Sequence, residues 1–208
     1  LNNLVSKQTQ LSAPLAALNK SYTLYGSNAT KMLLERLSAL TLQEQLLKMR
    51  SNLENAADDS SSILLDIIDL ETSEDETERS LAATASVIDS TFINIITTIY
   101  DLVATTEQSK YDLIIKELDY MVSEASTKLD FINTRGNGVV NSSTLEDLTA
   151  ESAKVFTLLK GNDSIIALKQ QQLSHEFAAA KQLVETQSSA KDVNKKMTVL
   201  AKSIDTFA

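Results

Sequence analysis

The sequence predicts an all-α protein, an elongated antiparallel helical bundle, and three observations lead to this fold class. Apolar residues recur three and four positions apart along most of the 208 residues, which in an α-helix places them on one face. Only four Gly and one Pro are present, so few positions interrupt a helix. Segments rich in β-branched residues, such as 92–100, keep the helical period and lack flanking turns. Strands are therefore not expected.

The longest helical pattern runs from Glu78 to Thr134 without a Gly or Pro. We expect one long helix here, which at 1.5 Å per residue would span about 85 Å. Polar residues 105–109 interrupt its apolar stripe, so a kink or a change of packing partner is expected there.

Two segments precede this helix. The first, 1–25, carries an apolar stripe with Pro14 inside it, so a kink or a late helix start is expected near residues 12–13. Residues 26–28 (Gly-Ser-Asn) predict a break, and a second helix follows from about 29 to 70, with an early stripe of Leu33, Leu37, Leu40 and Leu47. Within it, 58–62 is either a turn or a solvated stretch of helix.

Polar and glycine-containing runs predict the remaining boundaries. The acidic run 71–78 is expected to be a turn, with Thr72, Ser73 or Asp75 capping the long helix. Residues 135–138 (Arg-Gly-Asn-Gly) should end that helix. A short helix, 145–160, a turn at 161–163 and a last helix from about 164 to 208 complete the chain.

Stacking these lengths favours two nested four-helix bundles that share long helices, with both chain ends on the same side. Residues 1–28 and 140–208 are assigned to one bundle, and residues 29–139 to the other.

Composition argues against several classes of function. The net charge of −9 and the absence of Trp disfavour nucleic-acid binding. Because Cys is absent, disulfides, thiolate nucleophiles and Cys-ligated metals are excluded, which is compatible with an oxidising compartment. His175 is the only histidine and is expected to face solvent on a helix. Neither a catalytic constellation nor a cofactor site is expected, and no run of 18 apolar residues predicts a membrane span.

Four polar residues near the apolar stripes are candidate ligand-binding residues. Arg36 and Arg50 could hold a carboxylate between helices, the alternatives being an i,i+4 surface pair or an extended side chain at the bundle flank. Asn94 and Thr98, continued by Asp101 and Thr105, form a polar line that would line a ligand cleft or simply be an exposed face.

The spacing of the first fifty residues resembles a known family. The segments are Leu11–Leu18 (LSAPLAAL), Tyr22–Tyr25 (YTLY), a break, then Ala29 and a leucine-rich stretch. They are similar to the helical bimodular sensor domains, of the TorS type, in the periplasmic part of bacterial histidine kinases and chemoreceptors. The resemblance implies a homodimeric domain between two transmembrane helices, with 1–28 and 140–208 membrane-proximal and 29–139 membrane-distal. It also implies that the partner is a periplasmic binding protein or a directly bound small molecule.

Two other classes remain open. A helical pore-forming toxin also uses long helices, but its best insertion segment, 63–70, is interrupted by Asp66 and Asp69. A passive coiled-coil spacer or adaptor would need no ligand site.

Overall fold

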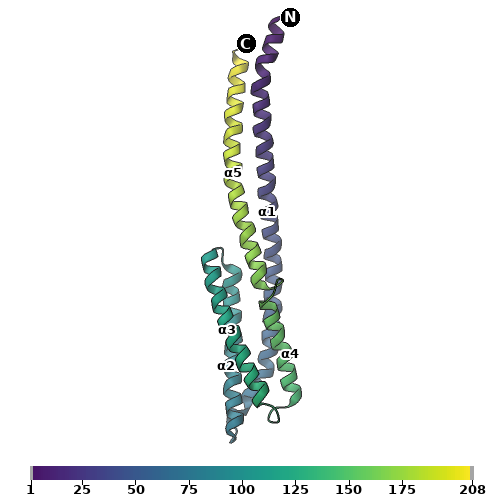
Figure 1. The fold of residues 1–208 in the computed structure, drawn as a ribbon, viewed down its shortest axis with the longest axis vertical. Coiled ribbons are helices and arrows are strands. Elements are labelled where there is room, and N and C mark those ends of the chain that lie inside the picture. The colour runs from purple at the N-terminus through teal and green to yellow at the C-terminus, as the bar shows by residue number, and fades with distance from the viewer. Residues whose placement is uncertain (1, 207–208) are drawn as a thin grey trace. The chain divides into compact units, whose positions relative to one another are not determined.

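The computed structural model describes residues 2–206, with side chains from residue 11 onward. Five α-helices and one short 3-10 helix make up this part of the chain, and no strand occurs in it (Figure 1). The elements are α1 (Asn2–Ile68), η1 (Asp69–Thr72), α2 (Glu76–Ala104), α3 (Gln108–Arg135), α4 (Ser142–Leu159) and α5 (Ile165–Asp205). The all-α class is confirmed.

The chain divides into two compact units, each described here by itself. Unit 1 contains residues 1–40 and 174–208, and unit 2 contains residues 41–173. These boundaries differ from the expected ones after residues 28 and 139. The described part of unit 1 contains two helical segments, from α1 and α5, rather than a four-helix bundle.

Unit 2 has a continuous apolar core. Helices α2 and α3 lie side by side as an antiparallel hairpin (Figure 1). Six large side chains of α2 are completely buried: Leu81, Ile88, Phe92, Ile95, Ile99 and Leu102. The Phe92 ring meets the edge of Phe156 from α4 at 6.2 Å between centroids. Burying each such side chain stabilises the unit by roughly 1.5–3 kcal/mol, so this face of α2 anchors the bundle.

The expected helix from Glu78 to Thr134 was wrong as a single element, because α2 ends at Ala104 and α3 begins at Gln108. Thr105 takes an extended conformation, and its backbone N–H still donates to the Asp101 carbonyl. The polar residues 105–109 were expected to kink the helix or to change its packing partner. In the structure the chain reverses direction at this position. The reversal lets the apolar stripes of α2 and α3 face each other.

The predicted break at 26–28 was also wrong, since α1 continues through it. A Cβ at Gly26 would meet nothing within 4 Å, so the position is an open helix surface. A glycine there costs only about 1 kcal/mol of helix propensity, which the flanking helical turns outweigh. Pro14 likewise lies inside α1.

Residues 58–62 are helical, so the turn considered there does not form. The Ser60 and Ser62 hydroxyls donate to the carbonyls of Ala56 and Asp58, at 2.8 and 2.9 Å. Such bonds within one helix remove the need for solvent or a turn.

The predicted cap of α2 at Asp75, the end of α3 at 135–138 and the turn at 161–163 are confirmed. The Asp75 carboxylate accepts from the N–H groups of Thr77 and Glu78, and these bonds lower the pKa of Asp75. Gly138 lies between α3 and α4, and Gly161 lies between α4 and α5. Their φ values of 82° and 105° are ones that L side chains rarely adopt, so glycine is favoured at both turns.

Candidate functional site

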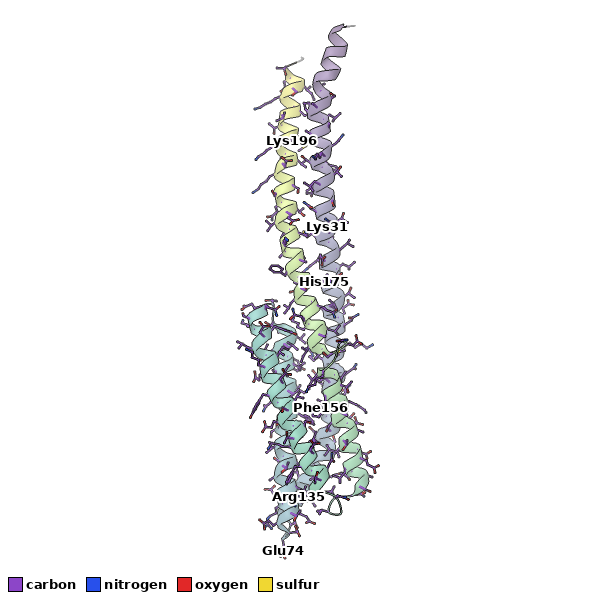
Figure 2. All side chains as sticks on the ribbon, viewed as in Figure 1. Lys31, Glu74, Arg135, Phe156, His175 and Lys196 are labelled. Atoms are coloured by element: carbon purple, nitrogen blue, oxygen red, sulfur yellow. The ribbon has the colours of Figure 1, made fainter. Side chains whose placement is uncertain are left out.

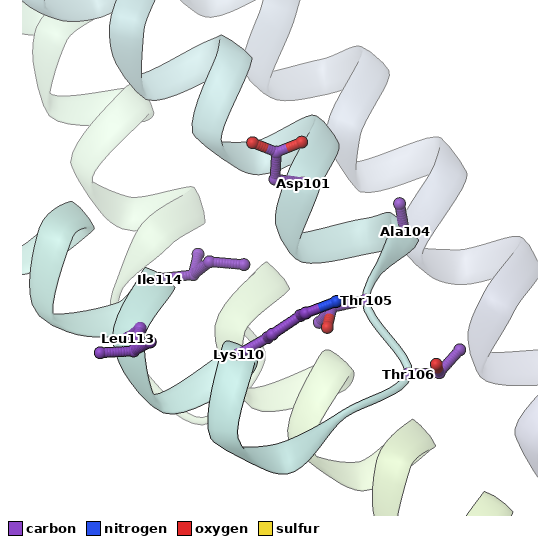
Figure 3. A pocket seen from close by; sticks show the side chains of 7 residues that line it. All are labelled: Asp101, Ala104, Thr105, Thr106, Lys110, Leu113 and Ile114. Atoms are coloured by element: carbon purple, nitrogen blue, oxygen red, sulfur yellow. The ribbon is translucent and has the colours of Figure 1, made fainter.

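A hollow of about 420 Å³ opens at the turn between α2 and α3 in unit 2 (Figure 3). Its lining combines an acid, a base, two threonines and apolar side chains: Asp101, Ala104, Thr105, Thr106, Lys110, Leu113 and Ile114. The Lys110 ammonium lies 3.3 Å from the Glu107 carboxylate, and both side chains are more than half exposed. Because exposed pairs contribute at most about 1 kcal/mol, Lys110 can exchange this partner readily.

A buried lysine supports the same turn. Lys169 of α5 is 1% exposed, and its ammonium donates to the Val103 carbonyl at 2.9 Å and to Gln172 Oε1 at 2.7 Å. Gln172 in turn donates to Gln43 of α1. Val103 lies in the last turn of α2, where carbonyls lack a partner within the helix. Lys169 therefore satisfies the end of α2 and places a positive charge at its negative dipole end.

A second contact from α5 fixes the start of α3. The Tyr111 hydroxyl donates to the Ile166 carbonyl at 3.2 Å, and burial raises the pKa of Tyr111. Gln108 and Gln170 exchange side-chain hydrogen bonds at 3.1 and 3.2 Å. The hollow thus lies on a turn held from its other side by the first turns of α5, and it offers a carboxylate and an ammonium to a small polar ligand.

Two further hollows occur in unit 2. One, of about 490 Å³, lies between the end of α3 and the start of α4, with Asn133, Asn137 and Thr149 among its polar groups. The other, of about 320 Å³, lies where α2 begins and α3 ends, with Glu76 and Arg135 facing it. Neither contains a buried charged group.

The four candidate residues chosen from sequence do not form one site. Arg50 pairs with Glu54 at 3.2 Å and lies over the Tyr100 ring, 4.4 Å from its centroid. This is the i,i+4 pair considered as the alternative, although both side chains are only 28% exposed. A hydrogen bond with Glu54 raises the pKa of Tyr100. Arg50 therefore belongs to a cluster on α1 and α2 with Glu54 and Tyr100, and none of these three residues lines the turn hollow.

The remaining candidates are dispersed. Thr98 is 8% exposed, Asn94 is exposed, and neither lines the turn hollow. Arg36 is exposed on the part of α1 that belongs to unit 1. Asp101 and Thr105, from the same predicted polar line, do line the hollow. The sequence pattern marked residues 105–109 as an interruption but predicted a kink there and not the end of α2, and Lys169 carried no recognisable signal.

In unit 1 the contact between α1 and α5, here called the seam, includes half-buried apolar residues such as Leu18 and Leu200 as well as polar ones. Side-chain pairs that cross it include Ser21–Asp192 at 2.5 Å, Asn28–Ser189 at 2.8 Å and Glu35–His175 at 2.6 Å. The α1 members are seven residues apart, so they recur on one face of the helix.

His175, labelled on α5 in Figure 2, is only partly exposed to solvent. Its side chain is 38% exposed and its Nδ1 lies 2.6 Å from a carboxylate oxygen of Glu35, which makes it part of the seam. A histidine beside a carboxylate forms a full ion pair only when the imidazole is protonated. The surrounding sequence, Gln-Gln-Gln-Leu-Ser-His-Glu, gave no sign of this partner because Glu35 lies on the other helix.

Metal and membrane features were sought in the described part of the chain. Between residues 2 and 206, no group of three His, Asp or Glu side chains is placed to hold a metal ion. In this range α2 is the one helix with the length and apolar composition needed to cross a membrane, and 44% of its most apolar window is buried in the structure. Because its large apolar residues form the core of unit 2, α2 behaves as a core helix.

Comparison with protein-family models, with curated proteins and with solved structures finds no match to this chain.

Proposed function

We propose that this chain is an extracytoplasmic, periplasmic sensor domain of a transmembrane receptor, most like that of a two-component histidine kinase. Docking of a small molecule or of a periplasmic binding protein would displace its helices. The supporting observation is the antiparallel pair in unit 1, whose two chain ends lie at the same end (Figure 1). Segments continuing from them would enter a membrane side by side.

The hydrogen-bonded pairs across the seam support displacement as the signal. A seam built from hydrogen-bonded side chains resists sliding less than a close-packed apolar one, because each bond contributes only about 1 kcal/mol net and can re-form after a shift. Small helix shifts at packed interfaces are a known switching motion. A chemoreceptor would use the same displacement with a different output domain.

The gene's flanking sequence gives the first test. An apolar span of about 20 residues on each side, with a kinase or methyl-accepting region beyond, is the expected result. A gene without two spans would refute the receptor.

Crosslinking gives the second test, and because these 208 residues contain no Cys, the introduced thiols are the only ones within this part of the protein. In the full-length receptor, Asn28→Cys with Ser189→Cys is bridged by a short thiol crosslinker, and basal output is measured before and after reduction. We expect bridging to change output severalfold and reduction to restore it. The control pair, Gln108→Cys with Gln170→Cys, joins side chains in unit 2 that are also in hydrogen-bond contact. Unchanged output with complete crosslinking at the seam would contradict the proposal.

A helical pore-forming toxin is the second candidate, favoured by the apolar character of α2. It predicts dye release from liposomes by the purified chain. The sensor proposal predicts none.

A further inference from the structure

We propose that Asn137 is a site of spontaneous covalent modification, at which the side-chain amide is lost and aspartate or isoaspartate forms without an enzyme. Asn137 and Gly138 are adjacent in the segment that joins α3 to α4, and both are exposed. Asparagine is among the thermolabile residues of proteins, and its neighbours decide how fast it reacts. This inference goes beyond the sensor function and does not depend on it, because it concerns the chemistry of one segment.

The reaction needs only these two residues and water. The backbone nitrogen of Gly138 attacks Cγ of Asn137, which forms a new N–C bond and closes a five-membered succinimide ring. The C–N bond of the side-chain amide breaks, and its nitrogen leaves as ammonia with the proton given up by the Gly138 nitrogen. Water then opens the ring. Opening at Cγ gives aspartate in an ordinary backbone, whereas opening at the backbone carbonyl gives isoaspartate, in which the chain runs through Cγ.

Gly138 removes the main steric obstacle to this attack. Any other residue after Asn137 would carry a Cβ beside the attacking nitrogen. The φ of Gly138 is 82°, and a Cβ built at this position would meet nothing within 4 Å. The backbone here lies in open space and can adopt conformations that other residues rarely reach. Bringing the Gly138 nitrogen to Cγ of Asn137 therefore costs little.

The Asn137 side chain is also not held by another group. Within residues 11–206, where side chains are described, its amide has no hydrogen-bond partner. Asn141, four residues further on and equally exposed, differs in this respect. Its Oδ1 accepts from the Ser143 N–H at 3.0 Å and caps α4. This bond restrains the Asn141 side chain, whereas that of Asn137 is free to turn toward the next peptide nitrogen.

The turn between α4 and α5 provides an internal reference. Asn162 is exposed and lies in a short connection between two helices, as Asn137 does. The residue that follows it is Asp163, whose Cβ and carboxylate crowd the attacking nitrogen. The two asparagines thus differ chiefly in the residue that follows each of them.

Conversion would alter the connection between α3 and α4. In this tight turn the Gly136 carbonyl accepts the N–H groups of Val139 and Val140, at 2.9 and 2.8 Å. Isoaspartate adds one carbon to the backbone inside the turn, and both products add a negative charge. Asn137 lines the hollow of about 490 Å³ together with Glu146, so the new carboxylate would face an existing one. Like charges at short range repel, so modification should loosen this connection.

Peptide mapping of the folded 208-residue chain tests the inference. The chain is incubated at mildly alkaline pH and digested with trypsin, which places Asn137 and Asn141 in peptide 136–154 and Asn162 in peptide 161–169. Each conversion raises the peptide mass by about 1 Da. We expect conversion at Asn137 to be at least ten times as fast as at Asn162, with fragment ions placing the change at Asn137 and not at Asn141. Isoaspartate, separated by chromatography, should accompany aspartate, because direct hydrolysis of the side chain cannot form it.

A gain-of-reaction variant isolates the role of the glycine. Asp163→Gly places glycine after Asn162, and circular dichroism confirms that the variant is folded. We expect conversion at Asn162 to become several times faster while that at Asn137 stays unchanged.

Three results would overturn the inference. One is equal conversion of Asn137 and Asn162 in the folded wild type. Another is conversion of Asn137 only after the chain is unfolded in urea, which would mean that the turn blocks the attack. The third is aspartate without isoaspartate at Asn137, which would exclude the succinimide route.

Discussion

Lys169→Met removes the buried ammonium that supports the turn between α2 and α3 while keeping most of the side-chain volume. In the wild type, the ammonium bonds to the carbonyl of Val103 and to the amide oxygen of Gln172, at 2.9 and 2.7 Å. The variant leaves the Val103 carbonyl in a buried position without this donor. It also leaves the terminal carbonyls of α2 without a nearby positive charge.

The expected change in the free energy of unfolding follows from these two losses. An unsatisfied buried acceptor costs about 1–3 kcal/mol, and loss of the charge at the helix end adds about 0.5–1 kcal/mol. Removing a buried charge recovers part of its desolvation cost, which offsets some of this loss. We therefore expect the free energy of unfolding of unit 2 to fall by about 1–3 kcal/mol. For a unit of this size the melting temperature should fall by roughly 4–12 °C.

Urea unfolding monitored at 222 nm measures the global effect, and amide hydrogen exchange over residues 103–111 measures the local one. Lys181→Met, an exposed lysine of the same helix, is the control and should change stability by less than about 0.5 kcal/mol. Amide hydrogen exchange over residues 103–111 should accelerate in Lys169→Met but not in Lys181→Met. A Lys169→Met chain as stable as the wild type, with unchanged exchange, would refute the assignment of Lys169 as the residue that satisfies the end of α2.

Three further predictions concern the fold. Asp75→Ala should lower the urea midpoint at pH 7. Because hydrogen bonds lower the folded-state pKa of Asp75, this carboxylate stabilises above its unfolded pKa and the contribution is lost as pH falls through the folded value, so wild type and variant should converge once the pH lies below the folded-state pKa. Phe92→Ala should cost about 3–5 kcal/mol in the same titration, whereas Ile93→Ala, at a 58% exposed neighbour, should cost under about 1 kcal/mol. Gly26→Ala should stabilise α1 by about 1 kcal/mol in thermal melts, whereas Gly136→Ala should destabilise, because its Cβ would lie 2.5 Å from a backbone oxygen.

The sequence predicted those features of the fold that local chemistry determines. Asp75 was among the expected caps because an acid before an apolar stripe satisfies the first N–H groups of a helix. The end of α3 was visible because glycines follow Arg135 directly. Such signals involve neighbours within a few residues, so no tertiary information was needed.

The turn at Thr105 shows why the other boundaries failed. Neither Gly nor Pro lies between Glu78 and Thr134, and the group that satisfies the end of α2 comes from Lys169, 66 residues beyond Val103. A helix end stabilised from so far away leaves only a polar interruption in the local sequence. Gly26 is the opposite case, since a residue typical of breaks lies on an open helix surface. The candidate site failed for the same reason, because Arg50 found its partners on its own helix and on Tyr100.

The leucines of α1 differ from the sequence prediction in their burial. Their spacing predicted a buried stripe at Leu33, Leu37 and Leu40, yet these side chains are 62%, 61% and 52% exposed. The seam instead uses the neighbouring positions Asn28 and Glu35, whose partners are polar. A periodic apolar stripe indicates that one face of a helix should be buried, but it does not indicate which partner covers that face.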